Sequence, residues 1–181
     1  MADTKEQFEI IIKQCREIFK KKLQDYGASW RIMRPESITD QLLIKAKRIR
    51  NLEIKKESLI NEGILPEFAG IVNYGVIGLI QLELGFSDIP DRTPQQALEL
   101  YDRLMTDTKE LMYAKNHDYD EAWRLMRISS YTDLIMTKLN RIKAIENNLG
   151  NVSFSEGIDT NYQDIINYAL FGLIKLTFDN N

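Results

Sequence analysis

The chain has 181 residues, of which 44% are hydrophobic and 28% charged, with 9 Gly and 4 Pro. A chain of this length makes about one domain and buries its own core, so this composition excludes a disordered or low-complexity protein. A single Cys and a single His exclude a disulfide framework and any metal site built from several thiolates or imidazoles. The net charge of −3 argues against a nucleic-acid partner.

The first half of the chain predicts three helices. Apolar residues recur at helical spacing over residues 4–24, which predicts an amphipathic first helix, followed by a short helix around a tryptophan. The second helix is expected to begin near Ser37 or Thr39, both suitable N-caps, and to continue toward Gly63. The third follows Pro66 and is apolar on nearly every side, which predicts that it lies in the middle of the protein.

The second half predicts the same elements again. A helix opens at Thr93-Pro94, and two more are expected over residues 129–148 and 160–177. No segment alternates as a strand does, so the predicted fold class is an all-α helical bundle. The most apolar stretch, residues 68–86, contains polar residues and predicts a buried helix with no membrane span. With no recognisable targeting segment, we expect a cytoplasmic protein.

The two halves are also similar residue by residue. Residues 25–53 align without a gap to residues 118–146, and 13 of these 29 positions are identical. Further on, residues 71–80 align to residues 165–174. The separation is 93 residues in the first alignment and 94 in the second, so one residue is inserted between them. Similarity at a nearly constant separation is typical of a tandem duplication.

We therefore predict one compact unit over residues 1–181, made of two three-helix repeats. The first repeat covers residues 1–87 and the second residues 93–181, related by a pseudo-twofold axis. The joint is expected at residues 88–92, where Asp and Pro residues break the helical pattern. The sequence is compatible with a homo-oligomer of such units.

One third-helix carboxylate distinguishes the second repeat from the first. Asn73 and Asn167 interrupt apolar runs, where an unpartnered amide costs roughly 1–3 kcal/mol, so each needs a partner. Asp164 lies three residues before Asn167 on the same helical face, whereas the first repeat has Gly70 there. A carboxylate on a buried helix needs a cation. That cation is either a metal ion or a basic side chain of the preceding helix.

Basic residues at a spacing of three mark the second helix of each repeat. Lys138 and Arg141 share a face, as do Lys45 and Arg48. Two cations facing a carboxylate-bearing helix suit a phosphate group, although a solvated basic face explains the same pattern.

Two aromatic residues, Tyr119 and Trp123, stand at a spacing of four, with equivalents in the first repeat. Such a pair can sandwich a nucleobase, but helical spacing is more often typical of core packing. The sequence lacks the glycine-rich loops that bind phosphates in other nucleotide enzymes.

The pattern K-x-x-D-Y-x-x-x-W, then K-x-x-R-I, then D-I-I-N-Y-A resembles the nucleotide-modification-associated domain family, a helical family of bacteria and phages. The layout is also similar to the MazG-like all-α pyrophosphohydrolases, which cleave NTPs to NMP and pyrophosphate with magnesium. The matching residues are Lys115, Asp118, Tyr119, Trp123, Lys138, Arg141, Asp164 and Asn167, with Lys22, Asp25, Tyr26, Trp30, Lys45, Arg48 and Asn73 in the first repeat.

This resemblance implies a nucleotide-binding protein, with Mg²⁺- or Mn²⁺-dependent hydrolysis of NTPs or dNTPs as the enzyme hypothesis. The E-x-x-E pair that holds magnesium in MazG-like enzymes is absent from the second helix. The alternative is a non-catalytic helical module for oligomerisation or partner binding. The expected catalytic residues are Asp164, Lys138 and Arg141; the expected metal ligands are Asp164, Asp133, Asp118 and Glu146; and the expected substrate-binding residues are Tyr119, Trp123, Asn167, Arg124, Lys45, Arg48 and Asn73.

Overall fold

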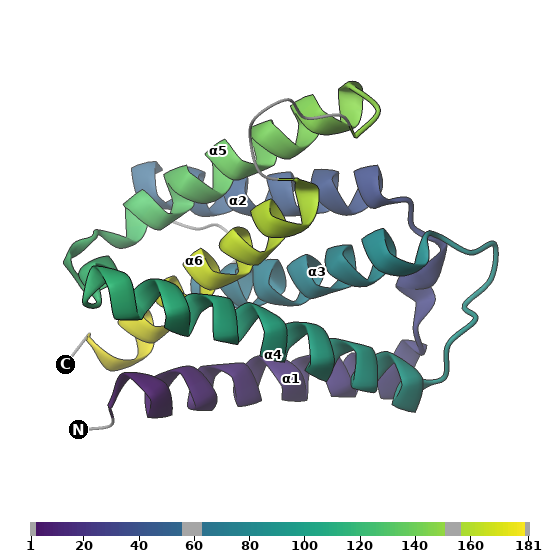
Figure 1. Ribbon diagram of the computed structural model, residues 1–181, viewed down its shortest axis with the longest axis horizontal. Helices are drawn as coiled ribbons and strands as arrows, with labels where there is room; N and C mark the ends of the chain where they lie inside the picture. The colour runs from purple at the N-terminus through teal and green to yellow at the C-terminus, as the bar shows by residue number, and fades with distance from the viewer. Residues whose placement is uncertain (1–2, 56–62, 151–156, 180–181) are drawn as a thin grey trace.

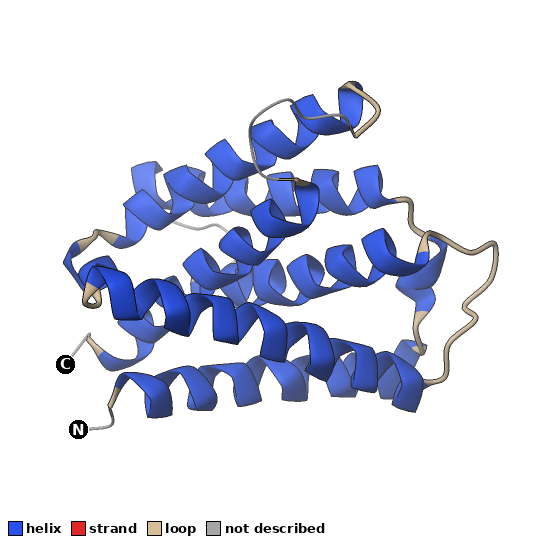
Figure 2. Cartoon of the chain, in the orientation of Figure 1, coloured by secondary structure: helices blue, strands red, loops and turns tan. Residues whose placement is uncertain are grey.

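A computed structural model describes residues 3–55, 63–150 and 157–179. Within these ranges all regular structure is helical, which confirms the predicted all-α fold class (Figure 2). Six α-helices and two short 3-10 helices follow one another as α1 Thr4–Tyr26, η1 Ser29–Ile32, α2 Pro35–Lys55, α3 Leu65–Leu84, α4 Pro94–Tyr119, η2 Ala122–Leu125, α5 Ile128–Asn147 and α6 Ile158–Phe178.

The helices form three layers of two, and each layer contains one helix from each half of the chain (Figure 1). Helices α2 and α5 make one outer layer, α1 and α4 make the other, and α3 and α6 lie between them. The middle helices contact both outer layers, which explains why they are apolar on nearly every side. Equivalent helices of the two halves lie against each other, as expected for a pseudo-twofold arrangement.

Glycines bring α3 and α6 close together. A Cβ atom placed on Gly78 would lie 2.6 Å from Cε1 of Tyr162, and one placed on Gly172 would lie 3.1 Å from Cε1 of Phe68. The two contacts are equivalent in the two halves: a third-helix aromatic ring lies over a glycine of the other third helix. Helix α3 is long and apolar enough to cross a membrane, but 67% of its apolar window is buried, as in a core helix.

Local sequence accounts for most helix boundaries. Asp3 caps α1, and Thr93 caps α4 as predicted. Helix α2 begins at Pro35, earlier than expected, because the fixed φ of proline suits a first helical turn. Thr39 therefore lies inside the helix and not at its cap. The predicted continuation of this helix beyond Lys55 falls outside the described residues.

A buried arginine fixes the connection between the two halves, residues 85–93. Nε of Arg31 donates to Oδ1 of Asp91 at 2.7 Å, and Nη1 donates to the carbonyl oxygen of Gly85 at 2.6 Å. The side chain of Gln81 accepts another hydrogen bond from the same guanidinium. The predicted joint, residues 88–92, lies within this anchored segment.

Candidate functional site

Asp164 lies between two lysines that come from two other helices. Oδ1 of Asp164 accepts a hydrogen bond from Nζ of Lys115 at 2.7 Å, and Oδ2 accepts one from Nζ of Lys138 at 2.9 Å. The side chain of Lys138 is 12% exposed and that of Lys115 is 45% exposed, so the group opens to solvent on the Lys115 side. We call these three residues the lysine–aspartate cluster. It joins α4, α5 and α6, and therefore all three layers.

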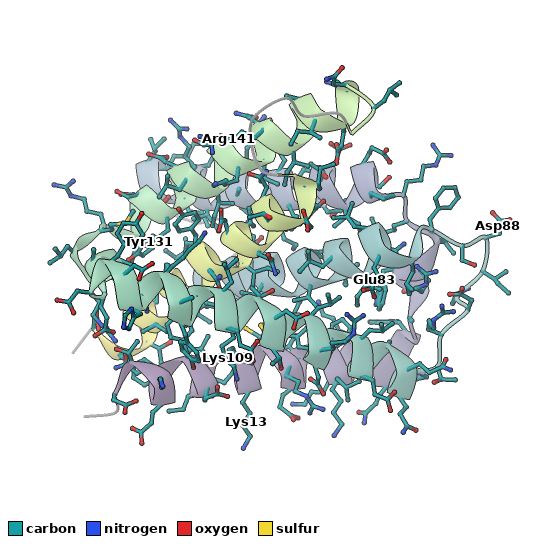
Figure 3. All side chains as sticks on the ribbon, in the orientation of Figure 1. Lys13, Glu83, Asp88, Lys109, Tyr131 and Arg141 are labelled. Atoms are coloured by element: carbon teal, nitrogen blue, oxygen red, sulfur yellow. The ribbon has the colours of Figure 1, made fainter. Side chains whose placement is uncertain are left out.

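A further cation lies beside the cluster. Arg141 follows Lys138 by three residues on α5, where Figure 3 labels it, and its side chain is exposed. Two ammonium groups on one carboxylate, with an exposed guanidinium one turn further along α5, give this group of four side chains an excess of positive charge in a chain of net charge −3. Ammonium and guanidinium groups form strong, charge-assisted hydrogen bonds with phosphate oxygens. An anion is therefore the ligand that this arrangement attracts.

The first repeat does not reproduce the cluster. Gly70 takes the place of Asp164, and a Cβ atom there would lie 3.1 Å from Cε of Lys45. Glu67, one turn earlier on α3, pairs with Lys45 at 3.8 Å and with Arg48 at 2.5 Å. Lys22, the equivalent of Lys115, is exposed on α1. The predicted substrate-binding residues Lys45 and Arg48 therefore form an ion-pair group of their own.

The two repeated asparagines make hydrogen bonds inside the core. Nδ2 of Asn73 donates to the carbonyl oxygen of Cys15 at 3.0 Å, and its Oδ1 accepts from the hydroxyl of Tyr101 at 2.7 Å. Nδ2 of Asn167 donates to the carbonyl oxygen of Thr108 at 3.2 Å. Both amides thus join a middle helix to the outer layer of α1 and α4.

Two of the expected metal ligands instead hold α2 against α5. Oε1 of Glu146 accepts from the hydroxyl of Thr39 at 2.6 Å, and Asp133 lies 3.9 Å from Arg50. The start of one helix thus contacts the end of the other, so α2 and α5 run antiparallel. Equivalent contacts with the repeats exchanged join Glu53 to Thr132 and Asp40 to Lys143.

The donor set around Asp164 does not suit magnesium or manganese. Asp118 is exposed near the end of α4, 3.3 Å from Nδ1 of His117, and Asp133 and Glu146 lie in the α2–α5 contact. Within the described ranges, no three acidic, His or Cys side chains are placed so that they could hold a metal ion together. Magnesium needs several hard oxygen ligands, whereas both oxygens of Asp164 already contact ammonium groups. The four expected ligands are not brought together.

Of the two expected base-binding aromatic residues, one belongs to the core and the other is exposed, four residues after Lys115. The ring of Trp123 is buried and stacks on Phe171, with centroids 4.4 Å apart and planes 10° apart. Cζ of Arg124 lies over the Trp123 ring, 4.4 Å from its centroid, and Nη2 donates to Oε1 of Gln7 at 2.6 Å. Tyr119 is 71% exposed at the end of α4. Core packing, the alternative that the helical spacing left open, accounts for Trp123.

A separate cavity of about 530 Å³ lies among the end of α3, the first half of α4 and the start of α6. Arg103 on its wall pairs with Glu83, which Figure 3 labels, while Asp107 and Asp159 add two more carboxylates. This excess of negative charge disfavours phosphate. Among the described residues, the charges at the lysine–aspartate cluster therefore suit an anion better than those of this cavity.

A family model described as nucleotide modification associated domain 1 matches residues 22–82 and, a second time, residues 115–176. The chain belongs to this family. The two matched segments fall one in each half of the chain, and they begin at the equivalent lysines, Lys22 and Lys115. No curated protein and no solved structure matches the chain.

In this nucleotide modification associated domain, Lys115 belongs to the candidate site, although it was not among the site residues predicted from the sequence. It belongs to the K-x-x-D-Y motif, so the signal was present. The contact of Lys115 with Asp164 depends on where α4 crosses α6. The spacing of residues within one helix does not predict that crossing. The salt bridge from Asp164 to Lys138, one of the two alternatives considered from the sequence, is present at 2.9 Å.

Proposed function

We propose that this protein binds a nucleotide through its phosphate groups at the lysine–aspartate cluster. The observation that carries the proposal is the buried carboxylate of Asp164, which holds two ammonium groups, one of them on a half-exposed side chain. The family description, which associates the domain with nucleotide modification, supports a nucleotide as the source of the phosphate.

In this proposal Asp164 is a positioning residue. Its two oxygens hold Nζ of Lys115 and Nζ of Lys138 on opposite sides of one carboxylate. An ammonium group has three N–H donors, so one hydrogen bond to Asp164 does not exhaust its capacity. Arg141 supplies a planar guanidinium that suits two oxygens of one phosphate. Preorganised donors reduce the ordering cost of binding.

Hydrolysis with magnesium is not part of the proposal, because the donor set at Asp164 does not fit the metal. The second candidate is the non-catalytic helical module for oligomerisation or partner binding. One observation favours it: the Thr39–Glu146 and Arg50–Asp133 contacts use repeated polar residues to join α2 to α5. This candidate predicts no affinity for nucleotides.

The test is a calorimetric titration of nucleoside mono-, di- and triphosphates, in the ribo and deoxy series, without divalent metal and at low salt. Lys115→Met is expected to weaken binding about tenfold or more, since a charge-assisted hydrogen bond contributes about 1.5–3 kcal/mol. Lys22→Met is the matched control, because it removes an exposed lysine at the equivalent position of α1. Its affinity should equal that of the wild type.

Two outcomes contradict the proposal, and a third would overturn its exclusion of metal-dependent hydrolysis. An absence of binding across the whole panel favours the non-catalytic module. Equal losses in Lys115→Met and Lys22→Met place the site elsewhere. Release of pyrophosphate with Mg²⁺ or Mn²⁺ that disappears in Asp164→Asn would mean that the nucleotide itself completes a metal site, and that the protein is an enzyme.

A further inference from the structure

An aromatic side chain lies one helical turn from Asp164 on the same face of α6. Tyr168 follows Asp164 by four residues, a separation at which side chains are neighbours on the helix surface. Its side chain is half-buried, whereas Asp164 and Asn167 are buried. Tyr168 therefore combines closeness to the cluster with an accessible part of its ring.

The first repeat shows what this position contacts. Tyr74 is the equivalent of Tyr168, and Nζ of Lys45 lies 5.5 Å from the centroid of its ring. Lys45 is the equivalent of Lys138. In the first repeat the third-helix tyrosine therefore stands beside the second-helix lysine. From the equivalence of the two repeats we expect Tyr168 to lie within reach of a ligand held by Lys138.

The ring of Tyr168 is supported from behind. Its centroid lies 6.5 Å from that of Tyr131, with planes 20° apart, and 6.2 Å from that of Phe171, with planes 67° apart. Figure 3 labels Tyr131 on α5. These neighbours restrict the orientation of the ring, so little side-chain freedom is lost when a flat group packs on it.

We propose that Tyr168 is the side chain on which the nucleobase stacks when phosphates are held at the lysine–aspartate cluster. This inference rests on the proposed function and deepens it: the ligand is a nucleotide recognised by its base as well as by its phosphates, not a bare polyphosphate. Trp123 does not take this role, because its ring is buried against Phe171.

The experiment compares two probes, ATP and inorganic tripolyphosphate, by calorimetry. Tyr168→Leu is expected to weaken ATP binding about tenfold, because stacking of one base on an aromatic ring is worth that much or more. The affinity for tripolyphosphate should not change. Tyr168→Phe keeps the ring and should bind ATP like the wild type. Tyr74→Leu, the equivalent change in the first repeat, is the matched control and should leave both affinities unchanged.

A second variant keeps the inference testable if Tyr168→Leu does not fold. In Tyr168→Trp, ATP should quench the fluorescence of the new indole and tripolyphosphate should not. The stacking role would be overturned if the wild type bound the two probes with equal affinity. It would also be overturned if Tyr168→Leu lost the same affinity for both probes, or if ATP did not quench the indole of Tyr168→Trp. Failure of the wild type to bind either probe would overturn the proposed function itself, so the two failures are distinguishable.

Discussion

Asn73 and Asn167 occupy equivalent positions, but their side-chain oxygens differ in hydrogen bonding. Oδ1 of Asn73 accepts from Tyr101, whereas Oδ1 of Asn167 is buried and has no partner among the described residues. The first-repeat equivalent of Tyr101 is Phe8, which is buried and carries no hydroxyl. The absence of a hydroxyl on Phe8 of α1 therefore explains the unpaired amide oxygen of Asn167.

Phe8→Tyr is expected to raise the free energy of unfolding by about 1 kcal/mol, because the new hydroxyl would donate to the unpaired Oδ1 of Asn167. The reciprocal change, Tyr101→Phe, should lower it by about 1–2 kcal/mol, because Oδ1 of Asn73 then loses its donor. Urea denaturation measures both values. A destabilised Phe8→Tyr protein would show that the two environments are not equivalent.

At Asp164, removal of the charge should destabilise the fold. Asp164→Asn leaves Lys138, which is only 12% exposed, without its carboxylate, and a loss of about 2–3 kcal/mol is expected. Adding Lys138→Met to this variant should recover part of the loss, because the unpaired cation is then gone. A double variant less stable than the single one, measured by thermal unfolding, would contradict this account.

At the scale of the helix, α3 has Gly70 at the position where α6 has Asp164. Gly70→Asp is expected to convert the first repeat into a second site and to change the binding stoichiometry from one nucleotide per chain to two. The added side chain meets the end of the Lys45 side chain, 3.1 Å away at Cε, which is flexible enough to move. Calorimetric stoichiometry tests this prediction. Gly70→Asn, which adds similar volume without charge, should keep one site.

The contact between α3 and α6 depends on small residues. Gly78→Ala should lower the stability by about 1–3 kcal/mol, because its Cβ would lie 2.6 Å from the buried ring of Tyr162. Gly172→Ala should cost less, since its nearest atom in Phe68 is 3.1 Å away. Thermal unfolding of the two variants under the same conditions gives the ranking. The reverse order would mean that Tyr162 moves more easily than Phe68.

At the scale of the whole molecule, two equivalent glutamates connect the halves across the α2–α5 layer. Burial raises the pKa of Glu53 and of Glu146 above the ordinary value of 4.5, although hydrogen bonds from Thr132 and Thr39 oppose the shift. The folded state therefore holds more protons than the unfolded state between the ordinary and the raised pKa. The stability that these carboxyls contribute is fully present below pH 4.5 and is lost as the pH rises through their raised pKa.

The double variant Glu53→Gln with Glu146→Gln removes both titrations and keeps an oxygen that accepts from each threonine. Its stability at pH 7 should rise relative to the wild type, while the two proteins should be similar at pH 4. Denaturant unfolding across this interval measures the difference. If the free energy of unfolding of the double variant changed with pH as steeply as that of the wild type, the two carboxyls would not control this pH dependence.

Helix positions were predictable from sequence because they depend on local features. Periodic apolar residues define the faces of α1 and α4, and Thr93-Pro94 marks a start that the structure confirms. The apolar runs of α3 and α6 predicted their central place. Polar residues were harder to assign: Asp133 and Glu146 share a helix with Lys138, yet their ion pair and hydrogen bond go to α2.

The sequence by itself determined an all-α protein with two similar halves, because the spacing of apolar residues and helix breakers acts within a few turns of chain. It also singled out Asp164 as the carboxylate that needed a partner. Only the tertiary structure decided that the partners are Lys115 and Lys138, and that Trp123 belongs to the core. Those contacts depend on how three layers of helices cross, and no single helix carries that information.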